Sequence, residues 1–247
     1  MPESKQVALV TGSATGIGRA VALRFARQGI AVAVNYSRSE QEARETLADV
    51  KKLGAPAILC RCNVADEAGV RAMVEQCRKE LGGLDILVNN AATTRFIEHS
   101  NLAALTEEVW DQILGVNLKG AYFCCRAAIP AMQERGSGAI VNVTSVAGVL
   151  GHGSSIAYAA SKAALNAMTK SLARAFAPAI RVNAVAPGPV LTRWLADHMD
   201  QVEQQLTLTP MKRAATPDDV ADVVAFLATG SSLITGQIVV LDGGRTM

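Results

Sequence analysis

The sequence lacks the features that mark membrane, secreted and nucleic-acid-binding proteins. No apolar run approaches the roughly 18 residues that a membrane-spanning helix needs. The first residues, Met1 to Gln6, lead into an expected strand without the pattern of a signal peptide. The formal net charge of the 247 residues is only +2, which gives no reason to expect nucleic acid or an anionic membrane as a partner. We therefore expect a protein of the cytoplasm.

Cysteine and histidine are too few and too scattered to predict a disulfide framework or a metal site. The chain has five cysteines, an odd number, and no expected export signal, so a disulfide framework is not expected. Its three histidines, His99, His152 and His198, do not supply further ligands at a suitable spacing, and we expect no metal. We expect small buried thiols at Cys60, Cys62, Cys77, Cys124 and Cys125.

Half of the residues are hydrophobic, and short apolar runs alternate with helical patterns along the whole chain. The run from Val7 to Thr11 is typical of a parallel strand that is buried on both faces. Helical patterns follow, for example over residues 41–53 and 66–81, and the alternation predicts parallel strands joined by helices. We therefore predict one doubly wound α/β domain over residues 1–247, with no linker or repeat.

A glycine-rich turn follows the first expected strand. Gly12, Gly16 and Gly18 come directly after Thr11, and a helical pattern then runs from Arg19 to Gln28. A strand, a glycine turn and a helix in this order can bring backbone N–H groups close to a pyrophosphate at the helix N-terminus. Glycines also simply make turns, so the context carries the interpretation. The arrangement predicts a dinucleotide site.

The second expected strand ends without an acidic residue. A Rossmann fold usually places Asp or Glu there, where the carboxylate binds the adenosine ribose and repels a 2′-phosphate. This chain has Tyr36, Ser37 and Arg38 instead, and its first acid is Glu40. Ser37 and Arg38 can bond a phosphate, which favours NADP(H) over NAD(H). The alternative is that Arg38 is a solvated loop charge.

A tyrosine and a lysine stand four residues apart in a predicted helix. Tyr158 and Lys162 then project from one face, and a cation beside a phenol favours the phenolate, so we expect Lys162 to lower the pKa of Tyr158. Ser145 follows a strand-like run, 139–144, and therefore belongs to the sheet edge where α/β proteins bind ligands. The alternative is an ordinary amphipathic helix start.

Ser145, Tyr158 and Lys162, taken with residues 11–18 and 89–91, make the chain resemble the short-chain dehydrogenase/reductase family. Within it, the chain is most similar to 3-oxoacyl-[acyl-carrier-protein] reductase-like members, from Val7 to Gly244. The resemblance implies a Rossmann fold with a seven-stranded parallel sheet flanked by helices, and a homotetramer. It implies four catalytic residues, Asn117, Ser145, Tyr158 and Lys162.

The resemblance also implies the remaining parts of the site. Asn117 would hold a water connected to Lys162 at a helix kink, Asn63 would contact adenine, and residues 188–213 would form a substrate lid. The segment 93–105 is longer than in fatty-acid-type relatives, so Phe96 to His99 should border the substrate pocket, with His99 at its rim. The implied cofactor contacts are Gly12, Ser13, Thr15, Gly16, Ile17, Gly18, Tyr36, Ser37, Arg38, Asn63, Val64, Asn90, Ala91, Ala92, Tyr158, Lys162, Pro187, Gly188, Val190 and Thr192.

The implied activity is NADPH-dependent reduction of a carbonyl, in a 3-oxoacyl thioester or a related ketone. Tyr158 would donate the proton, while Ser145 would bond the carbonyl oxygen. Arg126 and Arg174 stand where related reductases keep residues for an acyl carrier protein. The alternatives are a dehydrogenase of a free small alcohol, sugar or steroid, and a non-catalytic nucleotide-binding protein. The intact set of Ser145, Tyr158 and Lys162 argues against the last.

Overall fold

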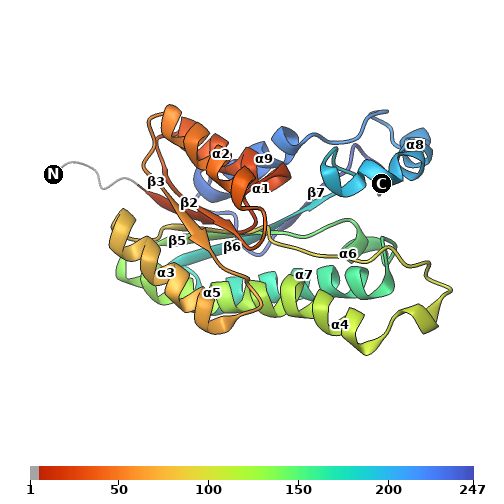
Figure 1. The fold of residues 1–247 in the computed structure, drawn as a ribbon, viewed down its shortest axis with the longest axis horizontal. Coiled ribbons are helices and arrows are strands. Elements are labelled where there is room, and N and C mark those ends of the chain that lie inside the picture. Colours follow the sequence, from red (N-terminus) through yellow and green to blue (C-terminus); the bar gives the residue numbers. More distant parts are fainter. Residues whose placement is uncertain (1–5) are drawn as a thin grey trace.

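A computed structural model describes residues 6–247, apart from the side chains at positions 197, 201, 202, 204 and 205. The expectation about the start of the chain falls mainly on residues 1–5, which lie outside the described residues. The described part forms a seven-stranded parallel sheet in the order β3-β2-β1-β4-β5-β6-β7 (Figure 1). The strands are β1 (Val7–Val10), β2 (Ala31–Tyr36), β3 (Ala57–Arg61), β4 (Ile86–Asn89), β5 (Gly138–Val143), β6 (Ile180–Pro187) and β7 (Ile238–Leu241). The predicted doubly wound α/β fold is confirmed.

Two layers of helices cover the sheet because its strands are apolar on both faces. Ala8 and Val10 of β1 pack into one hydrophobic cluster, whereas Leu9 packs into the other. This alternation has the period of two that a β-strand imposes. The first cluster lies under α1 (Gly16–Arg27), α2 (Glu40–Lys52) and α9 (Pro217–Ala225), and the second under α3 (Glu67–Leu81), α5 (Ala121–Glu134) and α7 (Ile156–Phe176) (Figure 1).

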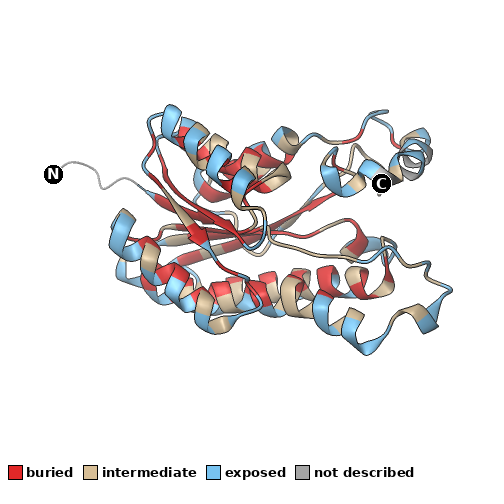
Figure 2. Ribbon diagram, in the orientation of Figure 1, coloured by how far each residue is buried: buried red, intermediate tan, exposed pale blue. Residues whose placement is uncertain are grey.

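Figure 2 shows the result as a buried sheet between helices whose outer faces are exposed. The five cysteines are free thiols in the second cluster, as expected. No helix within residues 6–247 is long and apolar enough to cross a membrane. In the same range, no three His, Cys, Asp or Glu residues are grouped so that they could hold a metal ion.

Several element boundaries differ from the sequence prediction. Helix α1 begins at Gly16 rather than Arg19, so two of the three glycines of the turn already belong to the helix. Thr106 stands at the N-cap of α4 (Glu107–Leu114), but its side chain makes no capping hydrogen bond. Thr216 does cap α9, in a capping box with Asp219, as its sequence predicts.

Short elements complete the chain, and most of them lie around the carboxyl ends of the strands. They are η1 (Leu102–Ala104), the π-helical η2 (Gly115–Gly120), α6 (Ala147–Leu150), η3 (Arg193–His198), α8 (Met199–Thr207) and the π-helical η4 (Phe226–Gly230). The segment expected to be a lid thus contains two helical pieces, η3 and α8. The carboxyl edge of the sheet is therefore where irregular chain gathers, as ligand sites of open α/β sheets require.

Candidate active site

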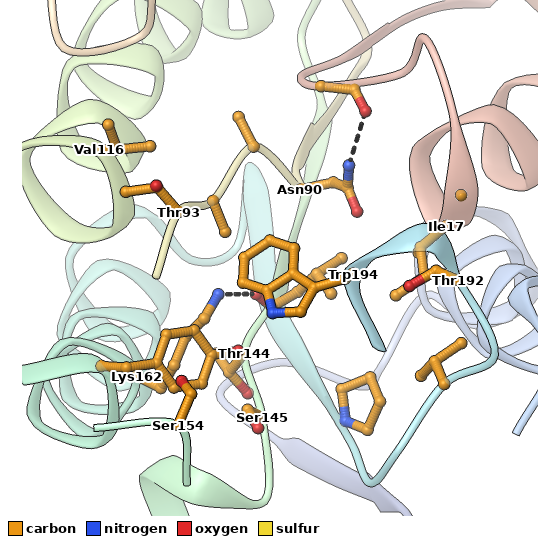
Figure 3. Close-up of a pocket in the computed structure, with 18 of the residues that line it drawn as sticks. Ile17, Asn90, Thr93, Val116, Thr144, Ser145, Ser154, Lys162, Thr192 and Trp194 are labelled. Carbon is orange, nitrogen blue, oxygen red and sulfur yellow. Dashed lines mark hydrogen bonds between the residues drawn. The ribbon is translucent and has the colours of Figure 1, made fainter. Parts of the chain in front are cut away.

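A cavity of about 890 Å³ lies along the carboxyl edge of the sheet (Figure 3). The loops after β1 to β6 all contribute to its wall. Of the residues that the sequence singled out for catalysis or cofactor binding, all but Ser13, Gly18 and Asn117 line it. The structure therefore brings together residues from Gly12 to Thr192, because the ends of parallel strands meet at one edge.

Hydrogen bonds fix the glycine turn to the neighbouring loops. The side-chain oxygen of Asn35 accepts from Gly12 N at 3.0 Å, while its Nδ2 donates to the carbonyls of Cys60 and Cys62. The Nδ2 of Asn90 donates to the carbonyls of Thr11 and Gly12 at 2.9 and 3.1 Å. The turn is thus held from two sides. Asn35 was not predicted as a site residue, although a buried Asn at the end of an apolar strand was a signal for such a role.

Ser13 and Gly18, which the resemblance implies as cofactor contacts, do not line the cavity but lie behind its wall. The Ser13 side chain is fully buried, donates to Val10 O at 2.7 Å and accepts from Asn35 N at 3.0 Å. A Cβ on Gly18 would stand 2.4 Å from Gly12 O and 2.6 Å from Asn90 Nδ2. Gly18 therefore lets α1 approach the turn closely, which no larger residue would allow.

Asn117 also lies behind the cavity wall. It sits in the π-helical turn η2, in agreement with the expected irregularity of this helix. Its Oδ1 accepts from Thr93 N at 2.8 Å, and its Nδ2 donates to Thr93 O and to Ser161 Oγ, both at 3.0 Å. Asn117 thereby joins the loop after β4 to helix α7. Its contacts fix the start of that loop and the turn of α7 next to Lys162.

Tyr158 and Lys162 stand one turn apart on α7, whose first turn is capped by the hydroxyl of Ser155. Lys162 is only 2% exposed, and its Nζ donates to Val143 O at 2.8 Å and lies 5.7 Å from the centre of the Tyr158 ring. Ser145 follows β5 and lines the same end of the cavity, where its hydroxyl accepts from Ala147 N at 3.1 Å. The predicted cluster of Ser145, Tyr158 and Lys162 is therefore assembled at one end of the cavity (Figure 3).

Burial controls the protonation of this cluster. Desolvation raises the pKa of Tyr158 to about 12, and the hydrogen bond of Ser145 offsets part of that shift. Desolvation also lowers the pKa of Lys162 to about 8. The prediction that Lys162 lowers the pKa of Tyr158 is wrong for the structure as described. The Lys162 ammonium is directed at a backbone carbonyl, and the loss of water around the phenol is the larger effect.

At the other end of the cavity, Ser37 and Arg38 are exposed after β2, beside the buried Tyr36. Asn63, after β3, is exposed and lines the cavity, and its side-chain oxygen accepts from Ala65 N at 3.2 Å. No acidic side chain lines this end of the cavity among the residues that the structure describes. Ser37 and Arg38 are therefore accessible at this end of the cavity, with no carboxylate beside them among the described lining residues.

The segment from Pro187 onward crosses the cavity and is fastened to the opposite wall. Arg193 donates to Glu42 Oε1 at 3.1 Å and to Ser39 Oγ at 3.0 Å, both at the start of α2. Thr192 lies against the glycine turn, where a Cβ on Gly16 would come within 3.4 Å of its methyl group. Trp194 follows, with its ring centre 6.2 Å from that of Tyr158. Neither Arg193 nor Trp194 was singled out from the sequence as a site residue.

A doubly wound sheet with a glycine turn and a cavity along its carboxyl edge defines a dinucleotide-binding domain. The family model described as Enoyl-(Acyl carrier protein) reductase matches residues 12–246. A protein of Streptomyces violaceoruber, named as a ketoacyl reductase of the granaticin polyketide synthase, is 42% identical, over 96% of this chain and 95% of its own. The 3-oxoacyl-[acyl-carrier-protein] reductase FabG of Staphylococcus aureus is 41% identical, over 97% of this chain and 98% of its own.

A crystal structure from Burkholderia xenovorans, described as a short-chain dehydrogenase/reductase, superposes with a TM-score of 0.93. It is 37% identical, and the match covers 99% of both chains. The chain belongs to the short-chain dehydrogenase/reductase family and is an NAD(P)-dependent enzyme of that family.

The burial of Lys162 predicts a pH-dependent stability. Its folded pKa is about 8, below the ordinary value of 10.5, so between these values the unfolded chain binds a proton that the folded chain has released. The free energy of unfolding therefore rises with pH in this window. From pH 8 to 10, wild type should gain about 2 kcal/mol relative to Lys162→Met, measured by urea unfolding.

The buried cysteines are present in both wild type and Lys162→Met. Their contribution to the pH dependence of the free energy of unfolding therefore cancels in the difference between the two proteins. The exposed Lys170, on the same helix, supplies the control Lys170→Met, whose difference from wild type should not change with pH. A constant difference between wild type and Lys162→Met over this range would contradict the assigned burial.

Proposed function

We propose that the protein reduces a carbonyl compound to an alcohol with NADPH, with Tyr158 as the proton donor. The observation that carries the proposal is the cluster of Ser145, Tyr158 and Lys162 at one end of a cavity whose other end has the shape and charge for a dinucleotide phosphate. A 3-oxoacyl thioester or a related ketone is the proposed substrate. The names of the relatives from Streptomyces and Staphylococcus support this class.

The residues along the cavity fit a nicotinamide dinucleotide. Gly12 has a φ of +62°, and a Cβ there would lie 3.0 Å from Ala91 Cα, so the turn leaves room only for glycine. The turn leads into the N-terminus of α1, which favours a pyrophosphate. Ser37 and Arg38 would take the 2′-phosphate, and Val190 and Thr192 would border the nicotinamide. When bound, this cofactor supplies the hydride.

The protein's part is to hold the carbonyl and supply a proton. Because its pKa is about 12, Tyr158 carries its proton at neutral pH and is ready to donate it to the oxygen as negative charge develops there. Ser145 donates a further hydrogen bond to that oxygen, at a fixed position. Lys162, whose Nζ donates to Val143 O and lies 5.7 Å from the centre of the Tyr158 ring, would hold the nicotinamide ribose beside the phenol.

Charged and apolar side chains on the surface bear on two proposed partners, an acyl carrier protein and further copies of the chain. Arg126 forms an ion pair with Glu67 and lies 5.6 Å from the ring centres of Tyr122 and Phe123, so it is engaged within its own surface. Arg174 is exposed, and an acyl carrier protein remains one proposed donor of the substrate. Apolar side chains such as Phe226 and Leu233 are exposed, which supports the proposal that the protein is a homotetramer. We expect the protein to act in the cytoplasm.

Tyr158→Phe tests the proposed proton donor. The change removes one hydroxyl, so kcat for ketone reduction should fall by about 10²-fold or more, while the Kd for NADPH stays within about threefold of wild type. Turnover can be followed by NADPH absorbance and binding by fluorescence. Tyr122→Phe removes a hydroxyl from an exposed tyrosine outside the cavity and should leave both quantities unchanged. Wild-type turnover in Tyr158→Phe would refute the mechanism.

Arg38→Glu tests the cofactor assignment. The new carboxylate would repel the 2′-phosphate, so the Kd for NADPH should rise at least about tenfold, while the Kd for NADH changes less than about threefold. Arg27→Glu makes the same charge change at an exposed site of α1 outside the cavity and serves as the control. Tighter binding of NADH than of NADPH by wild type, or equal weakening of both in Arg38→Glu, would overturn the preference.

A further inference from the structure

Rings gather at the Tyr158 end of the cavity, although the chain has few of them. The whole sequence contains ten aromatic residues, from its 2 Trp, 3 Tyr and 5 Phe, and three histidines. Phe96, Tyr158 and Trp194 line this part of the cavity, together with His152 and His198. They come from the loop after β4, the segment between β5 and α7, the first turn of α7 and the segment after β6. Their gathering indicates a wall with a specific chemistry rather than general apolar packing.

Hydrogen bonds hold the loop that carries Phe96 in place. Ile97 N donates to Ser154 O at 2.8 Å, and the hydroxyls of Thr94 and Ser154 are 2.6 Å apart. A ring nitrogen of His99 lies 3.1 Å from the carbonyl oxygen of Gly153, which itself lines the cavity, whereas His99 does not. Three contacts thus bind this loop to the residues just before Tyr158, so Phe96 has a defined position relative to the phenol.

The segment after β6 meets this wall through ring contacts. Phe96 stacks on His198 with ring centres 3.7 Å apart and an angle of 22° between the planes. The Trp194 ring is tilted by 57° to that of Tyr158, with 6.2 Å between the centres. Figure 3 shows the Trp194 ring projecting into the cavity. Trp194 and Phe96 nevertheless keep 37% and 40% of their surfaces exposed, so their rings have faces available to a ligand.

We propose that the preferred substrate is a ketone whose carbonyl is attached to a flat aromatic ring, and that Trp194 and Phe96 select it by ring contacts. This inference rests on the proposed function and names the substrate class of the same site. A flat ring can stack on, or pack edge-on against, the faces of Trp194 and Phe96 while its carbonyl oxygen meets Tyr158. A flexible acyl chain lacks these contacts and loses more conformational freedom on binding.

The reaction is the one already proposed. The hydride adds to the carbonyl carbon, Tyr158 gives its proton to the oxygen, and the ring is not reduced. The ring ketone can arrive free or as part of a thioester, and the assay separates these sources. α-Tetralone and trans-α-decalone are bicyclic ketones that differ in whether one ring is aromatic. Benzoylacetyl-CoA and acetoacetyl-CoA make the corresponding comparison for thioesters.

The experiment measures kcat/KM for these four compounds with NADPH. Wild type should prefer the aromatic member of at least one pair by about tenfold, and the pair that shows the preference identifies the source. In Trp194→Leu or Phe96→Leu that ratio should fall below about threefold. Tyr122→Leu removes an exposed ring outside the cavity and should keep the wild-type ratio.

Ratios near one for both pairs in wild type, or an unchanged ratio in both Trp194→Leu and Phe96→Leu, would overturn the inference. Reduction of acetoacetyl-CoA or trans-α-decalone separates this failure from failure of the proposed function. If either compound is reduced without an aromatic preference, only the substrate class is wrong. If none of the four is reduced with NADPH or NADH, the proposed function fails and the substrate class with it.

Discussion

The amide groups of the buried Asn35 and the partly buried Asn90 are the constraint on which the rest of the site depends. Asn35 joins the glycine turn after β1 to the loop after β3, and Asn90 joins the same turn to the loop after β4. A buried amide that lost these partners would cost about 1–3 kcal/mol, so the loops hold one arrangement. With the turn fixed, Gly18 can bring α1 against it without a gap. The cavity therefore has a rigid wall along its whole length.

Desolvation sets the chemistry at the opposite end. The same burial that keeps a proton on Tyr158 also makes the Lys162 ammonium costly, and the hydrogen bond to Val143 O orients its Nζ. Asn117 supports this arrangement through its bonds to Thr93 and Ser161, one residue before Lys162. In the proposed reaction, this protonated phenol gives its proton to the substrate oxygen.

Local patterns predicted most of the fold, whereas contacts between distant segments explain what they missed. Apolar runs located the strands, and residues directly after strands lined the cavity, because parallel strands share one carboxyl edge. The inward turn of the Ser13 hydroxyl depends on Asn35, 22 residues away. The stack of Phe96 on His198 joins segments about a hundred residues apart. The spacing of residues along the chain does not show which distant segments come into contact. It also does not show the desolvation that raises the pKa of Tyr158.

A crystal structure of the protein with NADP⁺ would test the central claim most directly. The account predicts the pyrophosphate against the turn of Gly12 and the N-terminus of α1, with the 2′-phosphate beside Arg38. The nicotinamide ribose should lie within hydrogen-bond distance of Lys162 Nζ, and the reactive face of the ring should point toward Tyr158 and Trp194. A nucleotide bound elsewhere, or one whose nicotinamide lies away from Tyr158, would contradict the account.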